Sequence, residues 1–294
     1  MRAKVVAPDT LRLKPTQSAG DATRLAREAV ASGADLVFVL GGDGTVNEAL
    51  NGMVRSTVPL AILPGGTANV LAMELGLGSR LDRAIERLAA CTARRVAVGR
   101  VVYLSYNGSR SHPAYNGSRS QPGNGSGHPA DRYFLAMGGA GLDAKIVFDL
   151  NPQFKARAGK LAYWLTGFGH ATQSVGQFEV CVDGEKHRCG FALVSRVRNY
   201  GGDLEIARGA SLLHEDFEVV MFEGENPLRY LWYMFGVGMK RVQQMAGVHT
   251  VRGGRVELSG NVHLQVDGEY AGMLPACIEI VPKSLTLLVP PAYK

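Results

Sequence analysis

Several features are scarce in this sequence, and each scarcity excludes a class of protein. Only 4 cysteines occur in 294 residues, and their spacing matches no metal or redox motif, so a disulfide-stabilised miniprotein and a zinc module are excluded. No apolar run approaches the roughly 20 residues that a membrane-spanning helix needs. The first residues lack the apolar core of a signal peptide. We therefore expect a soluble, cytoplasmic protein with reduced, buried thiols.

Charge of either sign is moderate, and aromatic residues are few. Lys and Arg number 32 against 26 Asp and Glu, and the net charge of +6 suits an anionic partner without choosing one. The basic residues are scattered and not clustered with the aromatics, which form 7% of the chain, so nucleic-acid binding is not supported. The sequence does not determine the oligomeric state, and a homodimer is among the alternatives. The 46% hydrophobic content suits one large or two modest globular domains.

Strand and helix patterns alternate in the first part of the chain, which we assign to an α/β domain over 1–97. The two expected strands lie at 36–40 and 60–63, and the first is predicted to be covered on both faces. The expected helices lie at 21–32, after the turn at 41–45, at 68–75 and at 81–91. Two successive strand–turn–helix units predict a parallel α/β layer.

The pattern then changes to short alternating strands, which predict a mainly β domain over 98–282. The expected strands lie at 100–104, 133–137, 177–182, 190–197, 217–222, 256–258, 263–266 and 277–281. The segment 105–131 repeats a unit rich in Gly, Ser, Asn and Pro that cannot bury a core. We predict that it is a flexible surface insertion without a catalytic role. The closing segment 283–294 is expected to return to the first domain.

Two apolar stretches with helical spacing interrupt the strands. The first is 161–170, and the second runs over 228–242 beside Lys240 and Arg241. The second stretch places on one helical face the residues Leu228, Leu231, Trp232, Phe235, Met239 and Val242. Two interpretations stay open: this face packs on a sheet, or it is exposed to lipid with the basic pair at anionic headgroups.

A glycine-rich turn follows each predicted parallel strand. The turn 41–45 reads Gly-Gly-Asp-Gly-Thr and opens a helix, where unpaired N–H groups and the helix dipole favour a phosphate. A single turn of this kind is as well explained by a tight strand-to-helix connection. A second turn, 64–67, at the neighbouring strand end favours nucleotide binding. Neither turn ends in Gly-Lys-Ser/Thr, and Asn47 stands where a dinucleotide fingerprint needs a small residue, so a Walker loop and an oxidoreductase are poor fits.

The two turns with their flanking residues closely resemble the paired motifs of the diacylglycerol kinase catalytic family, which includes bacterial soluble lipid kinases and sphingosine kinases. The motifs are Gly-Gly-Asp-Gly-Thr-Val-Asn-Glu at 41–48 and Pro-Gly-Gly-Thr-Ala-Asn-Val-Leu-Ala at 64–72. The first motif is shared more distantly with NAD kinases and phosphofructokinases, and the second separates the lipid kinases from them. Outside the insertion, the similarity runs from about 16 to 290 and includes Asp-Gly-Glu at 267–269.

The resemblance implies a fold and an activity. The fold is α/β, with an NAD kinase-like three-layer N-terminal domain and a C-terminal β-sandwich domain, and ATP lies in the cleft between them. The activity is transfer of a phosphoryl group from ATP, with Mg²⁺, to the hydroxyl of diacylglycerol or a related lipid. Such a reaction depends on positioning and on a carboxylate near the attacking hydroxyl. It also implies a peripheral contact with lipid at the inner membrane face.

The family's functional residues can be carried over by position. The nucleotide contacts fall on Thr16, Gly42, Asp43, Gly44, Thr45, Val46, Asn47, Glu48, Gly66 and Thr67. Asp43 serves the phosphate and metal region, Glu269 matches the proton acceptor, and Asp149 matches a carboxylate near it. From the residues alone, Asp267 and Gly268 form an ordinary hairpin turn that Glu269 follows.

The chain also departs from the family pattern. The family's first strand, with its Asn-Pro-x-Ser-Gly turn, is expected to be missing, since Thr16 falls so early. A structural magnesium site falls on Ser211, His214 and Asp216, where His214 replaces an acidic residue and is a poor ligand for a hard cation. Ala97 replaces another family aspartate. The alternatives to an active lipid kinase are a catalytically impaired nucleotide-binding relative and an NAD kinase, the latter disfavoured by 64–72.

Overall fold

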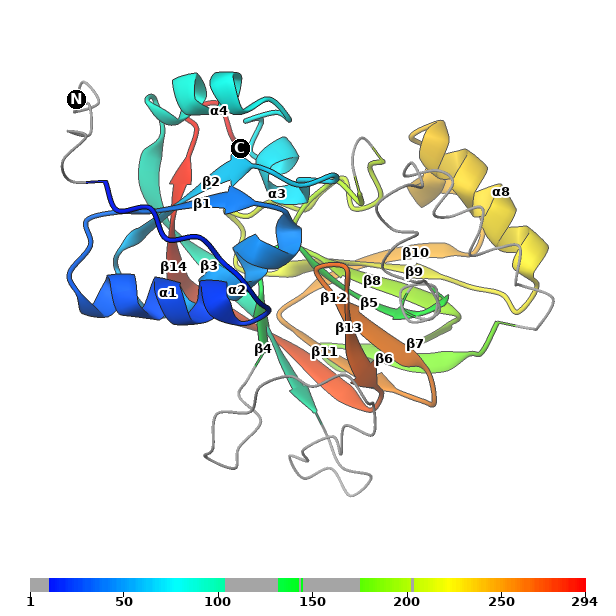
Figure 1. Ribbon diagram of the computed structural model, residues 1–294. Helices are drawn as coiled ribbons and strands as arrows, with labels where there is room; N and C mark the ends of the chain where they lie inside the picture. The colour runs from blue at the N-terminus through cyan, green and yellow to red at the C-terminus, as the bar shows by residue number, and fades with distance from the viewer. Residues whose placement is uncertain (1–10, 104–131, 143, 145–174, 202–203) are drawn as a thin grey trace.

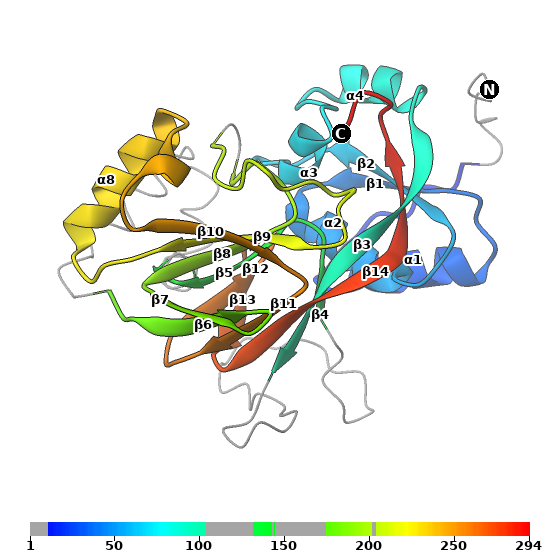
Figure 2. The same cartoon turned by 180° about the vertical axis from the view of Figure 1, so that it is seen from behind.

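The computed structural model describes residues 11–103, 132–142, 144, 175–201 and 204–294. The predicted insertion at 105–131, the predicted helix at 161–170 and Asp149 lie outside this part of the chain. The described strands form two sheets, one with eight strands and one with six. Figure 1 shows an α/β half on one side and an antiparallel β half on the other, and Figure 2 shows the same arrangement from behind.

The α/β half contains the predicted strand–turn–helix units. Strands β1 (Val37–Gly41) and β2 (Pro59–Pro64) pair in parallel. The helices of this half are α1 (Asp21–Ala31), α2 (Asp43–Met53), α3 (Val70–Glu74) and α4 (Leu81–Leu88). In Figure 1, α1 and α2 lie below β1 and β2, and α3 and α4 lie above them. Leu50 and Met53 of α2, both fully buried, anchor that helix in the core.

Two long strands run through both halves. β3 (Thr92–Tyr103) pairs antiparallel with β14 (Ala276–Val289), and Thr286 and Leu287 of β14 pair in parallel with β2. The β3–β14 pairing is regular except for a shift between Val281 and Leu285, where Lys283 adopts a φ of 47°. The predicted strands at 100–104 and 277–281 cover only the end of β3 and the beginning of β14, and the earlier part of β3 was not predicted because the exposed Arg94 and Arg95 interrupt its apolar pattern.

The second half is antiparallel. Its six-stranded sheet contains β5 (Met137–Gly141), β8 (Phe191–Ser195), β9 (Phe217–Phe222), β10 (Val248–Gly253), β12 (His263–Val266) and β13 (Glu269–Met273). The remaining strands extend the eight-stranded sheet: β4 (Arg132–Phe134), β6 (Phe178–Val182), β7 (Glu185–Cys189) and β11 (Arg255–Ser259). One apolar cluster joins the two sheets and includes Ile278 and Val256 of the larger sheet and Val194 and Leu264 of the smaller one. The predicted combination of an α/β domain with an antiparallel β domain is confirmed.

The prediction that the first strand is covered on both faces is wrong. Val39 of β1 is buried, but Phe38 and Leu40 are 38% and 56% exposed. The reason is position, because β1 ends the order of the eight-stranded sheet among the described strands and pairs there only with β2. An apolar run therefore does not distinguish a central from an edge strand.

The predicted strand at 133–137 is in fact divided between the two sheets. β4 pairs with β3 in the larger sheet, and β5 pairs with β8 and β12 in the smaller one. At the change of sheet, the N–H groups of Leu135, Ala136 and Met137 are bonded to the Asp267 carboxylate. The Asp267 carboxylate, distant in sequence, thus provides the hydrogen-bond acceptors that a neighbouring strand would otherwise provide for these N–H groups.

Helix α8 (Pro227–Gly238) packs on the smaller sheet. The face that it buries is opposite to the apolar face predicted from the sequence. Tyr230, Tyr233, Gly236 and Val237 are buried, and the Tyr230 hydroxyl donates to Phe222 O at 3.1 Å. The other face is exposed, with Leu228, Leu231, Trp232, Phe235 and Met239 between 41% and 69% accessible. The interpretation that this face packs on the sheet is wrong for these residues. In the described part of the chain, no helix is long and apolar enough to cross a membrane.

Candidate functional site

The two glycine-rich turns lie against each other at the ends of β1 and β2. Gly41 pairs with Pro64, and Gly65 N donates to Gly41 O at 3.0 Å. A Cβ placed on Gly66 would stand 2.5 Å from Gly42 Cα, so the two backbones meet where no side chain fits. Neighbouring parallel strands thus bring both turns to one place.

The start of α2 presents backbone N–H groups at this place. Its first intrahelical hydrogen bond runs from Val46 N to Gly42 O at 3.1 Å. The N–H groups of Asp43, Gly44 and Thr45 therefore precede the helical ladder and have no intrahelical acceptor. Together with the helix dipole, such groups attract a phosphate.

Asp43 connects the two turns. Its Oδ1 accepts a hydrogen bond from Val70 N at 2.7 Å, so the first residue of α2 caps α3. Burial raises the pKa of Asp43, and hydrogen bonds from the backbone of Val70 and Leu71 oppose that rise. Asp43 therefore holds the second turn against the first, while its contact with a metal ion stays a prediction.

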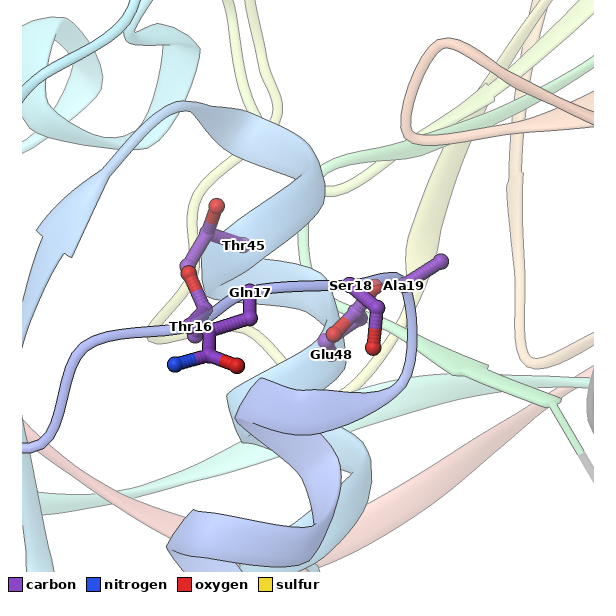
Figure 3. Close-up of a pocket in the computed structure, with 6 residues that line it drawn as sticks. All are labelled: Thr16, Gln17, Ser18, Ala19, Thr45 and Glu48. Atoms are coloured by element: carbon purple, nitrogen blue, oxygen red, sulfur yellow. The ribbon is translucent and has the colours of Figure 1, made fainter.

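A pocket of about 350 Å³ opens between α2 and the turn that precedes α1 (Figure 3). It is lined by Thr16, Gln17, Ser18, Ala19, Thr45 and Glu48. Asp21 Oδ2 accepts from Gln17 N and Ser18 N at 2.9 and 3.1 Å, which folds this turn back. Thr16 and Thr45, two of the predicted nucleotide contacts, thus share one pocket, whereas Thr67 is exposed on the second turn.

Glu269, the predicted proton acceptor, faces the first glycine turn from the antiparallel half. A Cβ placed on Gly44 would lie 2.8 Å from Glu269 Oε1. The second carboxylate oxygen is held by Arg132, whose Nη2 donates to Oε2 at 2.8 Å and whose Nη1 donates to Tyr270 O at 3.2 Å. A carboxylate with a fixed orientation thus stands over the N–H groups at the start of α2.

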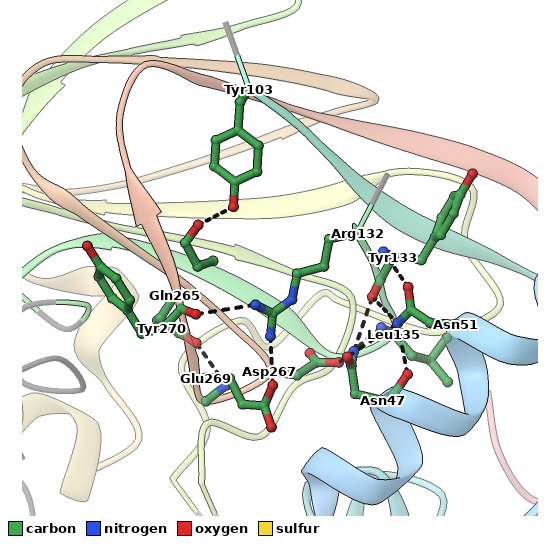
Figure 4. A network of polar contacts seen from close by, with 12 residues as sticks. Asn47, Asn51, Tyr103, Arg132, Tyr133, Leu135, Gln265, Asp267, Glu269 and Tyr270 are labelled. Atoms are coloured by element: carbon green, nitrogen blue, oxygen red, sulfur yellow. Dashed lines mark hydrogen bonds and ion pairs between the residues drawn. The ribbon is translucent and has the colours of Figure 1, made fainter. Parts of the chain in front are cut away.

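Asp267 lies at the centre of a polar network that joins the two halves (Figure 4). Its Oδ2 accepts from Asn47 Nδ2 at 2.8 Å and Leu135 N at 3.3 Å, and its Oδ1 from Ala136 N at 3.1 Å and Met137 N at 2.9 Å. Asn51, one turn further along α2, donates to Tyr133 O and accepts from Tyr133 N, both at 3.0 Å. Since Asp267 opens the turn that leads to Glu269, we assign it a positioning role.

Burial raises the pKa of Asp267 to about 6 from an ordinary value of 3.8. The nearby charge of Asp43 adds to this rise, and hydrogen bonds from Met137, Asn47 and Leu135 limit it. The folded chain therefore binds this proton more tightly than the unfolded chain does. The contribution of Asp267 to stability is consequently full below about pH 4 and is lost as the pH rises through about 6.

Replacing Asp267 by asparagine removes this titration. We expect the difference in free energy of unfolding between wild type and Asp267→Asn to narrow by on the order of 2 kcal/mol from pH 4 to pH 7. Urea denaturation at several pH values measures it. Asp183→Asn is the control, because Asp183 is exposed and also accepts from two backbone N–H groups, Gly254 and Arg255, at 2.9 Å. A difference that stays constant with pH for Asp267→Asn would contradict the prediction.

The remaining side chains of the first motif contact protein. Val46 lies in the core, the Asn47 amide bonds Asp267 and Tyr133, and Glu48 Oε2 accepts from Ala22 N at 3.2 Å. The Val46 and Asn47 side chains thus have partners within the protein, and nucleotide contacts through their backbone stay a prediction. Gly42 and Gly44 lie where the two turns meet, and as glycines they can contact a ligand only through their backbone.

The residues of the predicted magnesium site do not fit a metal ion. Asp216 is paired with Arg252 through Nη2 to Oδ1 at 2.5 Å and Nε to Oδ2 at 3.0 Å. His214 Nδ1 accepts from Arg252 Nη2 at 2.8 Å, since a guanidinium can only donate, and Ser211 Oγ accepts from Leu213 N at 3.3 Å. Among the residues described, no three His, Cys, Asp or Glu side chains gather closely enough to hold a metal.

The partner of Glu269 was not predicted from the sequence, and Asp267 was predicted only as a turn residue. Arg132 and Glu269 are 137 positions apart, and no local pattern links them. The Asp-Gly-Glu motif does point to Asp267, but an ordinary hairpin turn also explains Asp267 and Gly268, and the motif does not indicate the hydrogen-bond network around Asp267. Asp149, the third predicted catalytic residue, lies outside the described residues.

The fold is that of an NAD kinase-like class, in which an α/β unit is joined to an antiparallel β unit. Residues 3–101 match the diacylglycerol kinase catalytic domain, and residues 136–289 match the YegS C-terminal NAD kinase beta sandwich-like domain. The chain therefore belongs to the diacylglycerol kinase catalytic domain family, a family of lipid kinases whose membership implies use of ATP.

Several relatives match along most of the chain. A diacylglycerol kinase from Bacillus subtilis (strain 168) is 26% identical over 88% of this chain and 79% of its own length. A diacylglycerol kinase from Mycobacterium tuberculosis (strain ATCC 25618 / H37Rv) is 26% identical over 92% and 82%. A crystal structure of a diacylglycerol kinase from Bacillus anthracis str. Sterne matches with a TM-score of 0.68 and 22% identity over 94% and 85%, which shows a common fold.

Proposed function

We propose that this protein transfers the γ-phosphoryl group of ATP to the hydroxyl of diacylglycerol or a closely related lipid, with Mg²⁺ bound to the nucleotide. The observation that carries the proposal is the position of Glu269 Oε1, 2.8 Å from where a Cβ of Gly44 would be. This places a carboxylate beside the N–H groups that suit a phosphate. The two relatives named as diacylglycerol kinases support the choice of acceptor.

The residues fit the requirements of phosphoryl transfer. The N–H groups of Asp43, Gly44 and Thr45 bind and orient phosphate oxygens. Glu269 accepts the proton of the lipid hydroxyl as that oxygen bonds to the γ-phosphorus, and the bond to the bridging oxygen of ADP breaks. Arg132 keeps the carboxylate oriented through the 2.8 Å ion pair. Mg²⁺ would come with the nucleotide phosphates, whose charge it would screen, and Asp43 is the carboxylate of the turns that would hold it.

The test is a phosphorylation assay with the full chain, γ-labelled ATP, Mg²⁺ and mixed micelles. Diacylglycerol, sphingosine and, in a separate reaction, NAD serve as acceptors. The expected result is label in phosphatidic acid. Label in NADP would overturn the lipid assignment, and nucleotide binding without transfer to any acceptor would identify a catalytically impaired relative.

We also propose that the exposed face of α8 contacts the membrane that holds the substrate. This surface, Leu228, Leu231, Trp232, Phe235 and Met239, includes a stacked pair, Trp232 and Phe235, with ring centroids 5.4 Å apart. Three basic residues lie at its C-terminal end: Arg208 and Lys240, which both pair with Glu205 at 3.8 and 3.5 Å, and the exposed Arg241, so that positive charge exceeds negative charge there. An apolar face bordered by positive charge suits an anionic lipid surface. Figures 1 and 2 show α8 at the outer edge of the antiparallel half.

Removing the aromatic pair tests this contact. The double variant Trp232→Ser/Phe235→Ser is expected to bind vesicles containing phosphatidylglycerol about tenfold more weakly or worse, because two large apolar groups no longer enter the lipid. Vesicle co-sedimentation measures the binding. The control is Leu81→Ser/Ile85→Ser on α4, where the replaced side chains are 40% and 54% exposed. An equal loss of vesicle binding in both double variants, or no loss in the α8 variant, would argue against a membrane contact through α8.

A further inference from the structure

Backbone carbonyl groups of the loop 211–216 bind a buried arginine. The magnesium site predicted from the family lies in this loop. Arg196, next to the end of β8, is fully buried. Its Nη2 donates to Leu212 O at 2.8 Å, and its Nη1 donates to His214 O at 3.1 Å and to Asp216 O at 3.4 Å. Three carbonyl oxygens thus point at one positive charge, which is the ligand type that hard cations take in proteins.

The charge of Arg196 is retained at this position. Burial lowers the pKa of Arg196 to about 10, and the charges of Tyr293, Asp216 and Glu215 oppose the decrease. The guanidinium is therefore protonated at neutral pH. Its side-chain hydrogen bonds go to backbone carbonyls, and its Nε has no hydrogen-bond partner among the residues that the structure describes. The cost of burying this group is offset by the three carbonyl dipoles.

Two further side chains fix the same loop. Tyr293 Oη accepts from Leu212 N at 3.0 Å and donates to Glu74 Oε1 at 3.0 Å. Arg252, from β10, donates to the Asp216 carboxylate and to Gly209 O at 2.8 Å. Asp216, one of the two acidic side chains of this loop, is thus already paired with a cation.

We propose that the guanidinium of Arg196 is the resident cation of loop 211–216 and takes the place of a divalent metal ion there. The same residue is linked to the candidate active site, since Arg196 N donates to Ala136 O at 2.9 Å and Ala136 N donates to Asp267. The proposal concerns stability and metal dependence, so it stands or falls independently of the lipid kinase assignment.

The first experiment uses the unmodified full chain without nucleotide. Thermal unfolding is recorded after dialysis against EDTA and again with added MgCl₂ or MnCl₂. The midpoint is expected to stay within about 1 °C, because the loop needs no divalent ion. A decrease of several degrees in EDTA that Mg²⁺ or Mn²⁺ restores in wild type, but that is absent from Asp216→Asn, would overturn the proposal.

The second experiment changes the charge. Arg196→Met leaves the buried Leu212 carbonyl and the part-buried His214 and Asp216 carbonyls without the Arg196 donor and is expected to lower the midpoint by roughly 5 °C or more, and Arg196→Lys, which keeps the charge, by clearly less. Guanidinium chloride at low millimolar concentration is expected to raise the midpoint of Arg196→Ala, whereas urea at the same concentration is not. Equal midpoints for the Met and Lys variants would show that packing, and not charge, is what Arg196 contributes. If the Met and Ala variants do not fold, the metal titration of the wild type decides the question.

Discussion

Replacing Glu269 by glutamine is expected to lower kcat for lipid phosphorylation by about a hundredfold or more, which is the usual contribution of a positioned general base. Glutamine keeps the size of the side chain but cannot accept the hydroxyl proton. The proposed nucleotide contacts come chiefly from the backbone of the glycine turns, so we expect the affinity for ATP to change little. Initial rates with saturating ATP and diacylglycerol micelles measure the first quantity, and calorimetric titration with ATP measures the second.

Glu179→Gln is a closely matched control for that experiment. Glu179 also lies on a strand and forms an ion pair, with Lys186 at 3.0 Å, and its side chain is 49% exposed compared with 47% for Glu269. Loss of a surface ion pair alone should therefore leave kcat unchanged. A Glu269→Gln enzyme with wild-type kcat would remove Glu269 from the chemistry and, with it, the proposed mechanism.

Replacing Gly66 by alanine is expected to weaken ATP binding about tenfold or more. The new Cβ would stand 2.5 Å from Gly42 Cα and 3.3 Å from Asn69 Oδ1, so the turns must separate. Overpacking of this kind costs roughly 1–3 kcal/mol, and about 1.4 kcal/mol corresponds to a tenfold change in affinity. Asn69 would lose its paired hydrogen bonds with Gly66 N and Gly66 O, both 2.8 Å long.

Gly238→Ala is the control for the turn substitution. A Cβ at Gly238 meets nothing within 4 Å, so the variant adds a methyl group without a clash. Its ATP affinity should equal that of the wild type. If Gly66→Ala keeps wild-type affinity and a wild-type unfolding midpoint, the close approach of the two turns is not what binds the nucleotide.

Local sequence patterns predicted the strand–turn–helix units of the α/β half well. The glycine turns, the helix after each of them and the parallel pairing of β1 and β2 follow from residues that are close in sequence. Strands with polar sequences were missed, and β7 (Glu185–Cys189) is an example, because Glu-Lys-His-Arg shows no apolar alternation. Its pairing with β6 and not its own composition makes it a strand.

The contacts that complete the site depend on tertiary structure. Glu269 is oriented by Arg132, and Asp267 is bound by Asn47 across 220 positions. No propensity or spacing rule relates residues so distant in the chain. The same limit applies to Arg196, which reads in the sequence as one more scattered basic residue and acquires its role only through the fold around it.

The two strands that run through both halves determine how the halves are connected. The chain passes between the halves within β3 and within β14, and these strands are paired to each other along most of their length. The irregular stretch between Val281 and Leu285 is itself held, because Arg95 donates to Lys283 O and Thr286 Oγ1 and Arg55 N donates to Ser284 O. A double-stranded ribbon, and not a loose peptide, therefore fixes the orientation of one half relative to the other.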